Sequence, residues 1–294
     1  MLRVLLLTGA TGLIGSALLP RLTGAGHPVR CLVRDPRRLG DERVRVQIAL
    51  GDLSDPPSFR NALRGVDTVV HLATAIRDQP GGSIEELNAI ATWRMVEAAQ
   101  RAGVGHFMFF SAQGVSAHSR ARFMRAKALA EGAVADSGMR HTIFAPSIVY
   151  APGDMFLTLL ERMALLPVVP ISGSGRARFQ PMWAQDVASC IIAALECPDG
   201  SARYELSGPE TLSYDEIAEL VLRAAGRPRP LVHVPLAVVS RSLRVLESLV
   251  RSKAFATWDE AELMEITMLS ARGTADALSL GVTPKPMAAV LGVN

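Results

Sequence analysis

The fold is decided by the stretch Leu2-Arg3-Val4-Leu5-Leu6-Leu7-Thr8-Gly9-Ala10-Thr11-Gly12-Leu13-Ile14-Gly15, which opens the chain. An apolar run of strand length meets a turn with three evenly spaced glycines, and a helical pattern begins at Ser16. This order of strand, glycine-rich turn and helix is the context in which such a motif indicates a dinucleotide-binding site. The spacing is G-x-x-G-x-x-G rather than G-x-G-x-x-G, and a purely structural turn is the alternative.

Each glycine of the turn has a separate expected task. Gly9 would allow the tight turn out of the strand, Gly12 would let a pyrophosphate approach the backbone, and Gly15 would let the helix pack closely on the sheet. The phosphates would accept hydrogen bonds from unpaired amides at the helix N-terminus, where the helix dipole favours negative charge. The candidate cofactor-binding residues of this turn are Gly9, Thr11, Gly12, Leu13, Ile14 and Gly15.

The composition is that of a globular protein. The chain has 294 residues, of which 49% are hydrophobic and 20% charged, so it can bury a large core. No apolar stretch reaches the roughly 18 uncharged residues of a membrane span. Met1 leads straight into a strand, so we expect no signal peptide and a cytoplasmic location. Cys31, Cys190 and Cys197 lack the spacing of a metal site, and we expect no bound metal.

The net charge of +3, with a pI near 9.0, is spread along the whole chain. A nucleic-acid-binding protein would need a clustered basic stripe with aromatic residues. We therefore expect a small-molecule substrate and no nucleic-acid partner, while the oligomeric state is not indicated by the sequence.

A basic residue follows the second predicted strand, 28–33. Arg34 lies about 20 residues beyond the last glycine of the turn, where an NAD site usually has an acid for the ribose 2′-hydroxyl. An arginine instead suits the 2′-phosphate of NADP, and Arg37 and Arg38 follow closely. The sequence thus favours NADP(H) over NAD(H). The alternative is a solvated loop in which Asp35 offsets the positive charge.

Strands and helices continue to alternate after this point. The further predicted strands are 44–50, 66–72, 106–110 and 141–145, and the predicted helices are 57–63, 83–102 and 122–136. Ser83 with Glu86, and later Ser213 with Glu216, form capping boxes that start two helices. Six strands joined by such short connections predict an α/β fold with a doubly wound parallel sheet of the Rossmann type.

The carboxyl ends of parallel strands meet at one edge of the sheet, where ligands bind. Asp52 and Leu53 stand where an adenine would be met, although Asp52 or Asp55 could instead cap the next helix. His71, which ends the fourth strand, is interpreted as a packed residue rather than a base. The residues predicted to gather at this edge beside the glycine turn are Arg34, Asp52, Leu53, Ala73, Thr74, Ser111 and Pro146.

The regular alternation ends after Asp154, where proline- and glycine-rich stretches appear. A further strand is predicted at 204–208. We expect residues 1–150 to form the dinucleotide-binding domain. Residues 151–294 would form a smaller C-terminal α/β region on the substrate side, with 180–200 returning to the first domain.

Apolar residues recur at helical spacing from Leu231 to Val250, with Arg241, Arg244 and Arg251 among them. Residues 231–256 could therefore contact a membrane surface or another protein, which would make the cytoplasmic protein a peripheral one. Packing of this stripe against neighbouring helices is the favoured interpretation.

These motifs together resemble the short-chain dehydrogenase/reductase superfamily. The motifs are Thr8–Gly15, Gly51-Asp52-Leu53, His71-Leu72-Ala73, Ser111 and Phe123-x-x-x-Lys127. The stretches 146–154 and 180–188 look like the extended and atypical branch of that superfamily. The tail 280–284 is similar to bacterial NAD(P)-binding proteins related to an accessory subunit of respiratory complex I, and an NmrA-like group is similar as well.

In that superfamily a serine, a tyrosine and a lysine perform the acid/base work. By resemblance, Ser111 is the serine and Lys127 the lysine, while Phe123 occupies the tyrosine position one helical turn before Lys127. A phenyl ring has no proton to give, which removes a general acid that contributes about 10²–10⁴-fold. Tyr150 and His118 are substitute candidates, and each is interpreted as structural.

The resemblance implies an NADP(H)-dependent oxidoreductase of the atypical type that acts on a small apolar substrate, with Lys127 holding the ribose. Hydride transfer to a conjugated alkene, a quinone or a flavin would need no side-chain acid, because solvent can supply the proton. The alternative is a non-catalytic NADPH-binding protein, structural or regulatory, associated with a respiratory or membrane complex.

Overall fold

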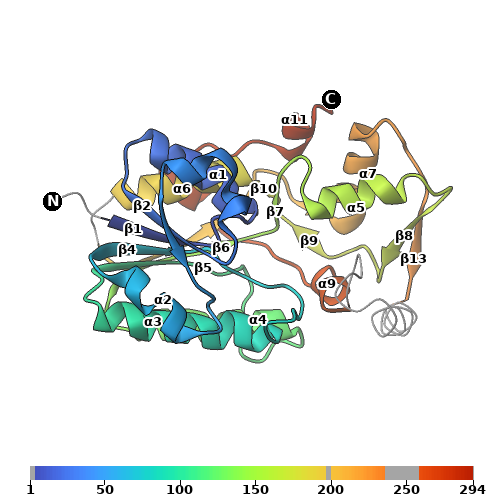
Figure 1. Cartoon of the computed structure of the whole chain (residues 1–294). Helices are drawn as coiled ribbons and strands as arrows, with labels where there is room; N and C mark the ends of the chain where they lie inside the picture. The colour runs from blue at the N-terminus through green and yellow to red at the C-terminus, as the bar shows by residue number, and fades with distance from the viewer. Residues whose placement is uncertain (1–3, 197–199, 236–257, 294) are drawn as a thin grey trace.

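The computed structural model describes residues 4–196, 200–235 and 258–293, and this part of the chain is built around a parallel sheet of seven strands (Figure 1). The strands are β1 (Val4–Thr8), β2 (Val29–Val33), β3 (Gln47–Leu50), β4 (Val66–His71), β5 (His106–Phe110), β6 (Arg140–Pro146) and β11 (Ala202–Leu206). Their order is β11-β6-β5-β4-β1-β2-β3, and every neighbouring pair is parallel. The predicted doubly wound α/β fold is confirmed, and the strand order reverses between β1 and β4.

Helices cover both faces of the sheet (Figure 1). One face carries α1 (Leu13–Gly24), α6 (Ala184–Glu196) and α10 (Ala275–Ser279). The other carries α2 (Pro56–Phe59), η2 (Arg60–Leu63), η3 (Glu86–Ile90), α3 (Ala91–Arg101) and α4 (Arg122–Ala135). The central strands β1, β4 and β5 are almost wholly buried, because helices meet both of their faces. This is why these strands are continuous apolar runs in the sequence.

Two elements from beyond residue 150 complete these layers. Strand β11 pairs with β6 from Ala202 opposite Thr142 to Leu206 opposite Pro146, and helix α6 packs on α1. The sequence predicts a strand near β11 but does not place it in the main sheet. The division of the chain into two domains at residue 150 stays a prediction.

The remaining elements lie beyond the carboxyl ends of the central strands (Figure 1). Three two-stranded sheets join β7 (Val149–Tyr150) to β10 (Met182–Trp183), β8 (Val169–Ser172) to β13 (Leu231–Val234) and β9 (Arg178–Phe179) to β12 (Leu212–Ser213). The helices here are α5 (Met155–Met163), α7 (Tyr214–Ala224), α9 (Trp258–Leu263) and α11 (Met287–Leu291). A separate hydrophobic core joins these elements to α4. No helix in the described residues is long and apolar enough to cross a membrane.

Some predicted boundaries are wrong. The predicted helix from Leu231 begins instead with strand β13, because these residues pair in register with β8. The rest of that predicted segment, 236–256, lies outside the described residues, as does Cys197. The predicted helix 57–63 begins at Pro56, with two prolines in its first turn where their missing N–H groups cost no intrahelical bond, and it divides into α2 and η2. The predicted helix 83–102 starts at its Ser83 capping box as expected, but it contains the π-helical turn η3 at Glu86–Ile90 before α3.

Candidate functional site

The glycine turn is tightly packed on two sides and open on the third. Gly9 has a φ of +73°, and a Cβ there would lie 2.7 Å from the backbone N of Ala73, in the loop after β4. A Cβ on Gly15 would clash with the carbonyl oxygen of Gly9 and with Ala10. Gly12 is exposed, and a Cβ there would meet only the Gly9 oxygen, at 3.3 Å. The turn therefore forms a cradle whose open side is at Gly12.

This open side is the N-terminus of α1. Gly12 is the N-cap residue, and no side chain caps the helix. The N–H of Gly12 donates to the Gly9 carbonyl at 3.0 Å and that of Ser16 to the Gly12 carbonyl at 2.9 Å. The backbone amides between Gly12 and Ser16 belong to the first turn of α1 and have no intrahelical acceptor. A close backbone approach, free amides and a helix dipole together fit a dinucleotide pyrophosphate.

The basic residues after β2 are exposed at the same edge of the sheet. Arg34 directly follows β2, and Arg37 and Arg38 lie in the following helix η1 (Pro36–Val44). The Asp35 carboxylate accepts a hydrogen bond from the N–H of Arg37 at 3.0 Å and so caps η1. Asp35 thus has a local structural role beside Arg34.

The loop after β3 is held by its own serines. One carboxylate oxygen of Asp52 accepts hydrogen bonds from the N–H and the hydroxyl of Ser54, each at 2.9 Å. Asp55 is the N-cap residue of α2, but its side chain makes no capping hydrogen bond. Asp55 thus occupies the predicted N-cap position without a capping bond, and the Asp52 carboxylate bonds to Ser54 instead of capping the helix. Leu53 is half-buried in this loop.

The loop after β4 is fixed by a residue that the sequence does not reveal. Asn88, buried in η3, accepts hydrogen bonds from the Thr74 hydroxyl at 2.9 Å and the Ala75 N–H at 3.2 Å. Its amide also donates to the carbonyls of Ala75 and Ile84. The only signal in the sequence is an asparagine within an apolar helical pattern. Asn88 holds Ala73 and its neighbours against the glycine turn.

His71 is a packed residue. Its ring bonds to the hydroxyls of Thr8, at 2.9 Å, and Thr92, at 3.1 Å, and it is 1% exposed. Burial, with the nearby Lys127 charge, lowers the pKa of His71 to about 3. The imidazole is therefore neutral near pH 7 and is enclosed in the sheet–helix interface.

Ser111 lies just beyond β5, but its hydroxyl is already bonded. The Ser111 Oγ donates to a carboxylate oxygen of Glu131 on α4 at 2.5 Å. The other Glu131 oxygen accepts from the Arg203 guanidinium on β11 at 2.7 Å. Ser111 is 3% exposed. Its hydroxyl is thus directed to α4, and Glu131 is a partner that spacing in the sequence cannot identify.

Lys127 and Phe123 share one face of α4. The Lys127 Nζ donates to the Phe110 carbonyl at 2.6 Å and lies 4.9 Å from the centre of the Phe109 ring and 5.8 Å from that of Phe123. Burial lowers the pKa of Lys127 to about 7. Phe123 is buried in the core that joins α4 to the C-terminal elements. The structure therefore brings Ser111, Phe123 and Lys127 together around the end of β5.

The two substitute candidates differ in environment. Tyr150 on β7 is 1% exposed, and its hydroxyl has no hydrogen-bond partner within the described residues. Burial raises the pKa of Tyr150 above its usual range, and the Glu210 and Asp186 charges add to this. His118 is exposed in the loop after β5. Pro146, at the end of β6, is buried and accepts a hydrogen bond from the Gln113 N–H.

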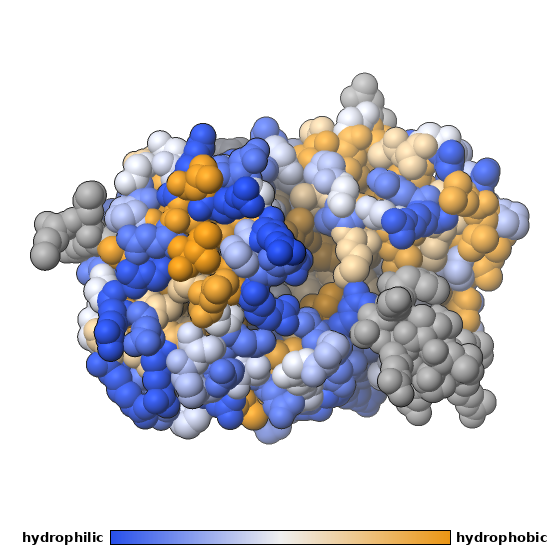
Figure 2. All heavy atoms as spheres, in the orientation of Figure 1, coloured by the Kyte–Doolittle hydropathy of each residue, from blue (hydrophilic) through white to orange (hydrophobic). Residues whose placement is uncertain are grey.

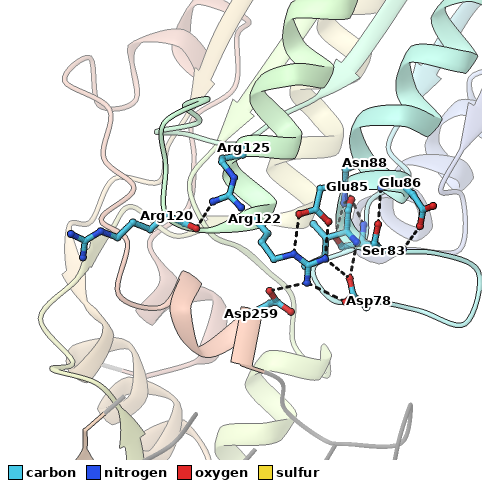
Figure 3. A network of polar contacts seen from close by, with 11 residues as sticks. Asp78, Ser83, Glu85, Glu86, Asn88, Arg120, Arg122, Arg125 and Asp259 are labelled. Carbon is cyan, nitrogen blue, oxygen red and sulfur yellow. Dashed lines mark hydrogen bonds and ion pairs between the residues drawn. The ribbon is translucent and has the colours of Figure 1, made fainter. Parts of the chain in front are cut away.

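An arginine-centred network closes one side of the site (Figure 3). Arg122, next to Phe123 at the start of α4, forms bidentate contacts with Glu85, at 2.7 and 2.9 Å, and with Asp78, at 3.1 Å. It also approaches Asp259 of α9 at 3.6 Å. The loop after β4, the start of α4 and helix α9 are thus joined. Figure 2 shows a hollow between the two halves of the molecule, beyond the strand ends.

Comparison with known proteins agrees with this geometry. A sequence model of a family described as NAD(P)H-binding matches residues 9–157. An NAD(P)H azoreductase of Xenophilus azovorans is 31% identical over 235 residues, which cover 79% of this chain and 78% of that protein. Subunit 9 of the alpha subcomplex of mitochondrial NADH dehydrogenase from Arabidopsis thaliana is 31% identical over 231 residues. This match covers 72% of the chain but only 56% of the plant protein.

The solved structures show the same fold. A nucleoside-diphosphate-sugar epimerase from Staphylococcus aureus superposes with a TM-score of 0.79 at 22% identity, covering 98% of this chain and 99% of that one. The predicted resemblance to the atypical short-chain dehydrogenases is confirmed by the family match and by the relatives that share it. The chain therefore belongs to the NAD(P)H-binding family and has its Rossmann fold.

Proposed function

We propose that this protein is an NADP(H)-dependent oxidoreductase that reduces a small apolar molecule, with solvent rather than a side chain supplying the proton. The observation that carries the proposal is the combination of Phe123 at the tyrosine position with a Ser111 hydroxyl bonded to Glu131 at 2.5 Å. The cradle for a dinucleotide is present, but the usual proton donor beside it is not.

The cofactor would be held by the edge of the sheet described above. The turn from Gly9 to Gly15 would take the pyrophosphate on its free amides. Arg34 would pair with the 2′-phosphate, which supports a preference for NADP(H). Asp52 and Leu53 would border the adenine. When bound, the nicotinamide supplies a hydride.

Lys127 would hold the ribose through a second hydrogen bond. Its Nζ now donates to the Phe110 carbonyl, and the residue is 2% exposed. An ammonium group has three N–H donors, so a ribose hydroxyl could accept a further one while the bond to Phe110 stays in place. The buried setting of Lys127 supports a role in binding more than one in acid/base chemistry.

The substrate class follows from the missing acid. Reduction of a simple ketone needs a proton at the carbonyl oxygen in the transition state, and a positioned acid contributes about 10²–10⁴-fold there. A substrate that delocalises the negative charge brought by the hydride depends less on a positioned acid. A conjugated alkene, a quinone, a flavin or an azo compound belongs to this class, and a relative of this chain is named an azoreductase. Apolar neighbours such as Phe123, Ala112 and Ile84 favour a small apolar molecule.

The test is NADPH oxidation by the purified protein with a panel of acceptors: an enone, a quinone, an azo dye, free flavin and a simple ketone. We expect turnover with at least one conjugated acceptor and little with the ketone. Reduction of the ketone at a comparable rate would contradict the proposal. If NADPH binds tightly but none of the acceptors is reduced, the proposal is also contradicted. That result would favour the second candidate below.

A second function is a non-catalytic NADPH-binding protein of a respiratory or membrane complex. Two observations favour it: the Ser111 hydroxyl is bonded to Glu131 while Lys127 is buried, and a relative is named a subunit of mitochondrial NADH dehydrogenase. In this case the cofactor would stabilise the fold. Saturating NADPH would then raise the unfolding temperature without any turnover.

A further inference from the structure

An exposed apolar loop lies beside β8 and β13, in the half of the molecule that does not contain β1 and α1 (Figure 1). Residues Leu165, Leu166, Pro167 and Val168, which we call the tip loop, connect α5 to β8 and are all exposed. The exposed fractions are 67% for Leu165, 49% for Leu166 and 40% for Val168. On the neighbouring strand β13, Val232 is 45% exposed and lies opposite Pro170 of β8. Figure 2 shows apolar side chains gathered in this half of the molecule.

The tip loop is held in place by its backbone and by its buried flanks. Ala164 before it and Val169 after it are fully buried. The amides of Leu165 and Leu166 donate to carbonyls at the end of α5, at 3.1 and 2.9 Å. The Val169 amide donates to Pro230, and the Arg229 guanidinium donates to the Ala164 carbonyl. These hydrogen bonds hold the start and the end of the loop, and its side chains are presented to the outside.

Arginines outnumber acids in the segments that flank the tip loop and β13. Two stretches of the chain make up this region. Residues 161–170 contain the end of α5 and the tip loop, and residues 223–235 contain the end of α7 and β13. Glu161 is the only acid in these two stretches. The same stretches contain four arginines, and all are exposed: Arg162, Arg223, Arg227 and Arg229. An exposed apolar loop flanked by arginines is the pattern of a surface that enters the headgroup region of an anionic bilayer.

We propose that the tip loop and its arginines are a docking surface for an anionic lipid membrane. Leu165, Leu166 and Val168 would enter the boundary between headgroups and acyl chains, and the arginines would contact lipid phosphates. A second copy of the chain is a poorer occupant, because a two-fold interface would bring the same arginines against each other. The glycine turn lies in the other half of the molecule and would stay clear of the bilayer (Figure 1).

The test is co-sedimentation of the full chain with vesicles of phosphatidylcholine containing about 30% phosphatidylglycerol, against vesicles of phosphatidylcholine alone. We expect binding to the anionic vesicles only, weakened by added salt. The double variant Leu165→Asp with Leu166→Asp should bind at least tenfold more weakly, since it removes two apolar groups and adds like charge. Arg162→Gln with Arg227→Gln should reduce binding by about 25-fold, at roughly fivefold for each arginine.

Matched variants on the other half of the protein are the controls. Leu129 on α4 is 59% exposed, and Leu129→Asp should bind vesicles as the natural protein does. Arg60→Gln with Arg64→Gln is the control for charge. A fluorophore sensitive to polarity, attached at Leu166→Cys in a Cys197→Ser background, should shift to the blue on anionic vesicles, and the same label at Leu129→Cys should not. Unchanged thermal unfolding shows that each variant is folded.

Three outcomes would overturn the proposal. Equal binding to both kinds of vesicle would remove the role of the arginines. Unchanged binding by the Leu165→Asp, Leu166→Asp variant would show that another surface meets the lipid. Self-association in sedimentation velocity that this variant abolishes, without vesicle binding, would make the tip loop a contact between protein copies instead.

Discussion

The Ser111 hydroxyl donates a hydrogen bond to the Glu131 carboxylate at 2.5 Å, and Arg203 holds the other oxygen of that carboxylate. A hydroxyl that donates its one proton to a carboxylate has no proton left for a substrate. In this protein the end of β5 is therefore a structural junction between the sheet and α4. Together with Phe123 at the tyrosine position, this junction leads to the proposal of hydride transfer without a positioned acid.

Replacing Phe123 by tyrosine should restore part of the missing chemistry. The ring centre of Phe123 lies 5.8 Å from the Lys127 Nζ, so a hydroxyl added to this ring would be near a cation that favours its ionised form. We expect Phe123→Tyr to raise the rate of ketone reduction by about tenfold or more and to leave the rate with a quinone within about twofold. Steady-state NADPH oxidation measures both. An equal gain with the two acceptors would show that the substitution acts by packing.

The stability of the cofactor-free protein should depend on pH through Lys127. Burial lowers its folded-state pKa to about 7, below the usual 10.5 of the unfolded chain. Between these values the unfolded state binds more protons, so the free energy of unfolding should rise with pH from about 7 to about 8.5. Above about pH 9 the cysteines oppose this, because burial raises the pKa of Cys31 and Cys190 to about 12.

Lys127→Met tests this dependence. The methionine keeps much of the apolar volume and removes the titrating group. Urea unfolding at a series of pH values should show the rise in the natural protein and a flatter profile in the variant. The same rise in both proteins would assign it to another group.

Arg34 should decide which dinucleotide binds. It is exposed directly after β2, and Asp35 beside it is occupied in capping η1. Loss of a charge-assisted contact with a phosphate is worth about 1.5–3 kcal/mol, so Arg34→Asp should weaken NADPH binding by about 10- to 100-fold. NADH should bind as before or more tightly. Calorimetric titration with both dinucleotides checks this, with Arg60→Asp as a control. Tighter NADH binding by the natural protein would contradict the assignment.

The two glycines of α1, Gly15 and Gly24, provide a test variant and a control for the packing of the glycine turn. A Cβ on Gly15 would clash with the Gly9 carbonyl, whereas nothing lies within 4 Å of a Cβ on Gly24 at the other end of the helix. Gly15→Ala should destabilise the protein by about 2 kcal/mol or more, because the backbone of the turn must move. Gly24→Ala should stabilise it by up to about 1 kcal/mol. Chemical denaturation of both variants compares them, and equal effects would mean that the turn is not tightly packed.

Local patterns in the sequence were sufficient for much of the architecture. The strand–turn–helix order of residues 4–24 and the capping boxes at Ser83 and Ser213 depend on neighbours a few residues away, and the structure contains them all. Strand β11 was recognisable as a strand, but its place beside β6 depends on contacts about 60 residues apart, which no local pattern encodes.

The side-chain partners at the site could not be predicted for the same reason. Glu131 meets Ser111 only because α4 packs under β5, and in the sequence Glu131 is an ordinary helix-surface acid. Asn88 and Arg122 likewise gain their roles from loops that fold onto them. The tyrosine position was different. Its distance from Lys127 is set within one helix, so the family resemblance could be carried over to Phe123 by sequence spacing.

The most direct test of the central claim compares two acceptors of the same size. We would measure NADPH oxidation by the natural protein with 1,4-naphthoquinone and with 1-tetralone, which share a fused ring but differ in their need for a proton donor. The quinone should be reduced at least about 100-fold faster, the factor that a missing general acid implies. Comparable rates, or reduction of the tetralone alone, would contradict the account.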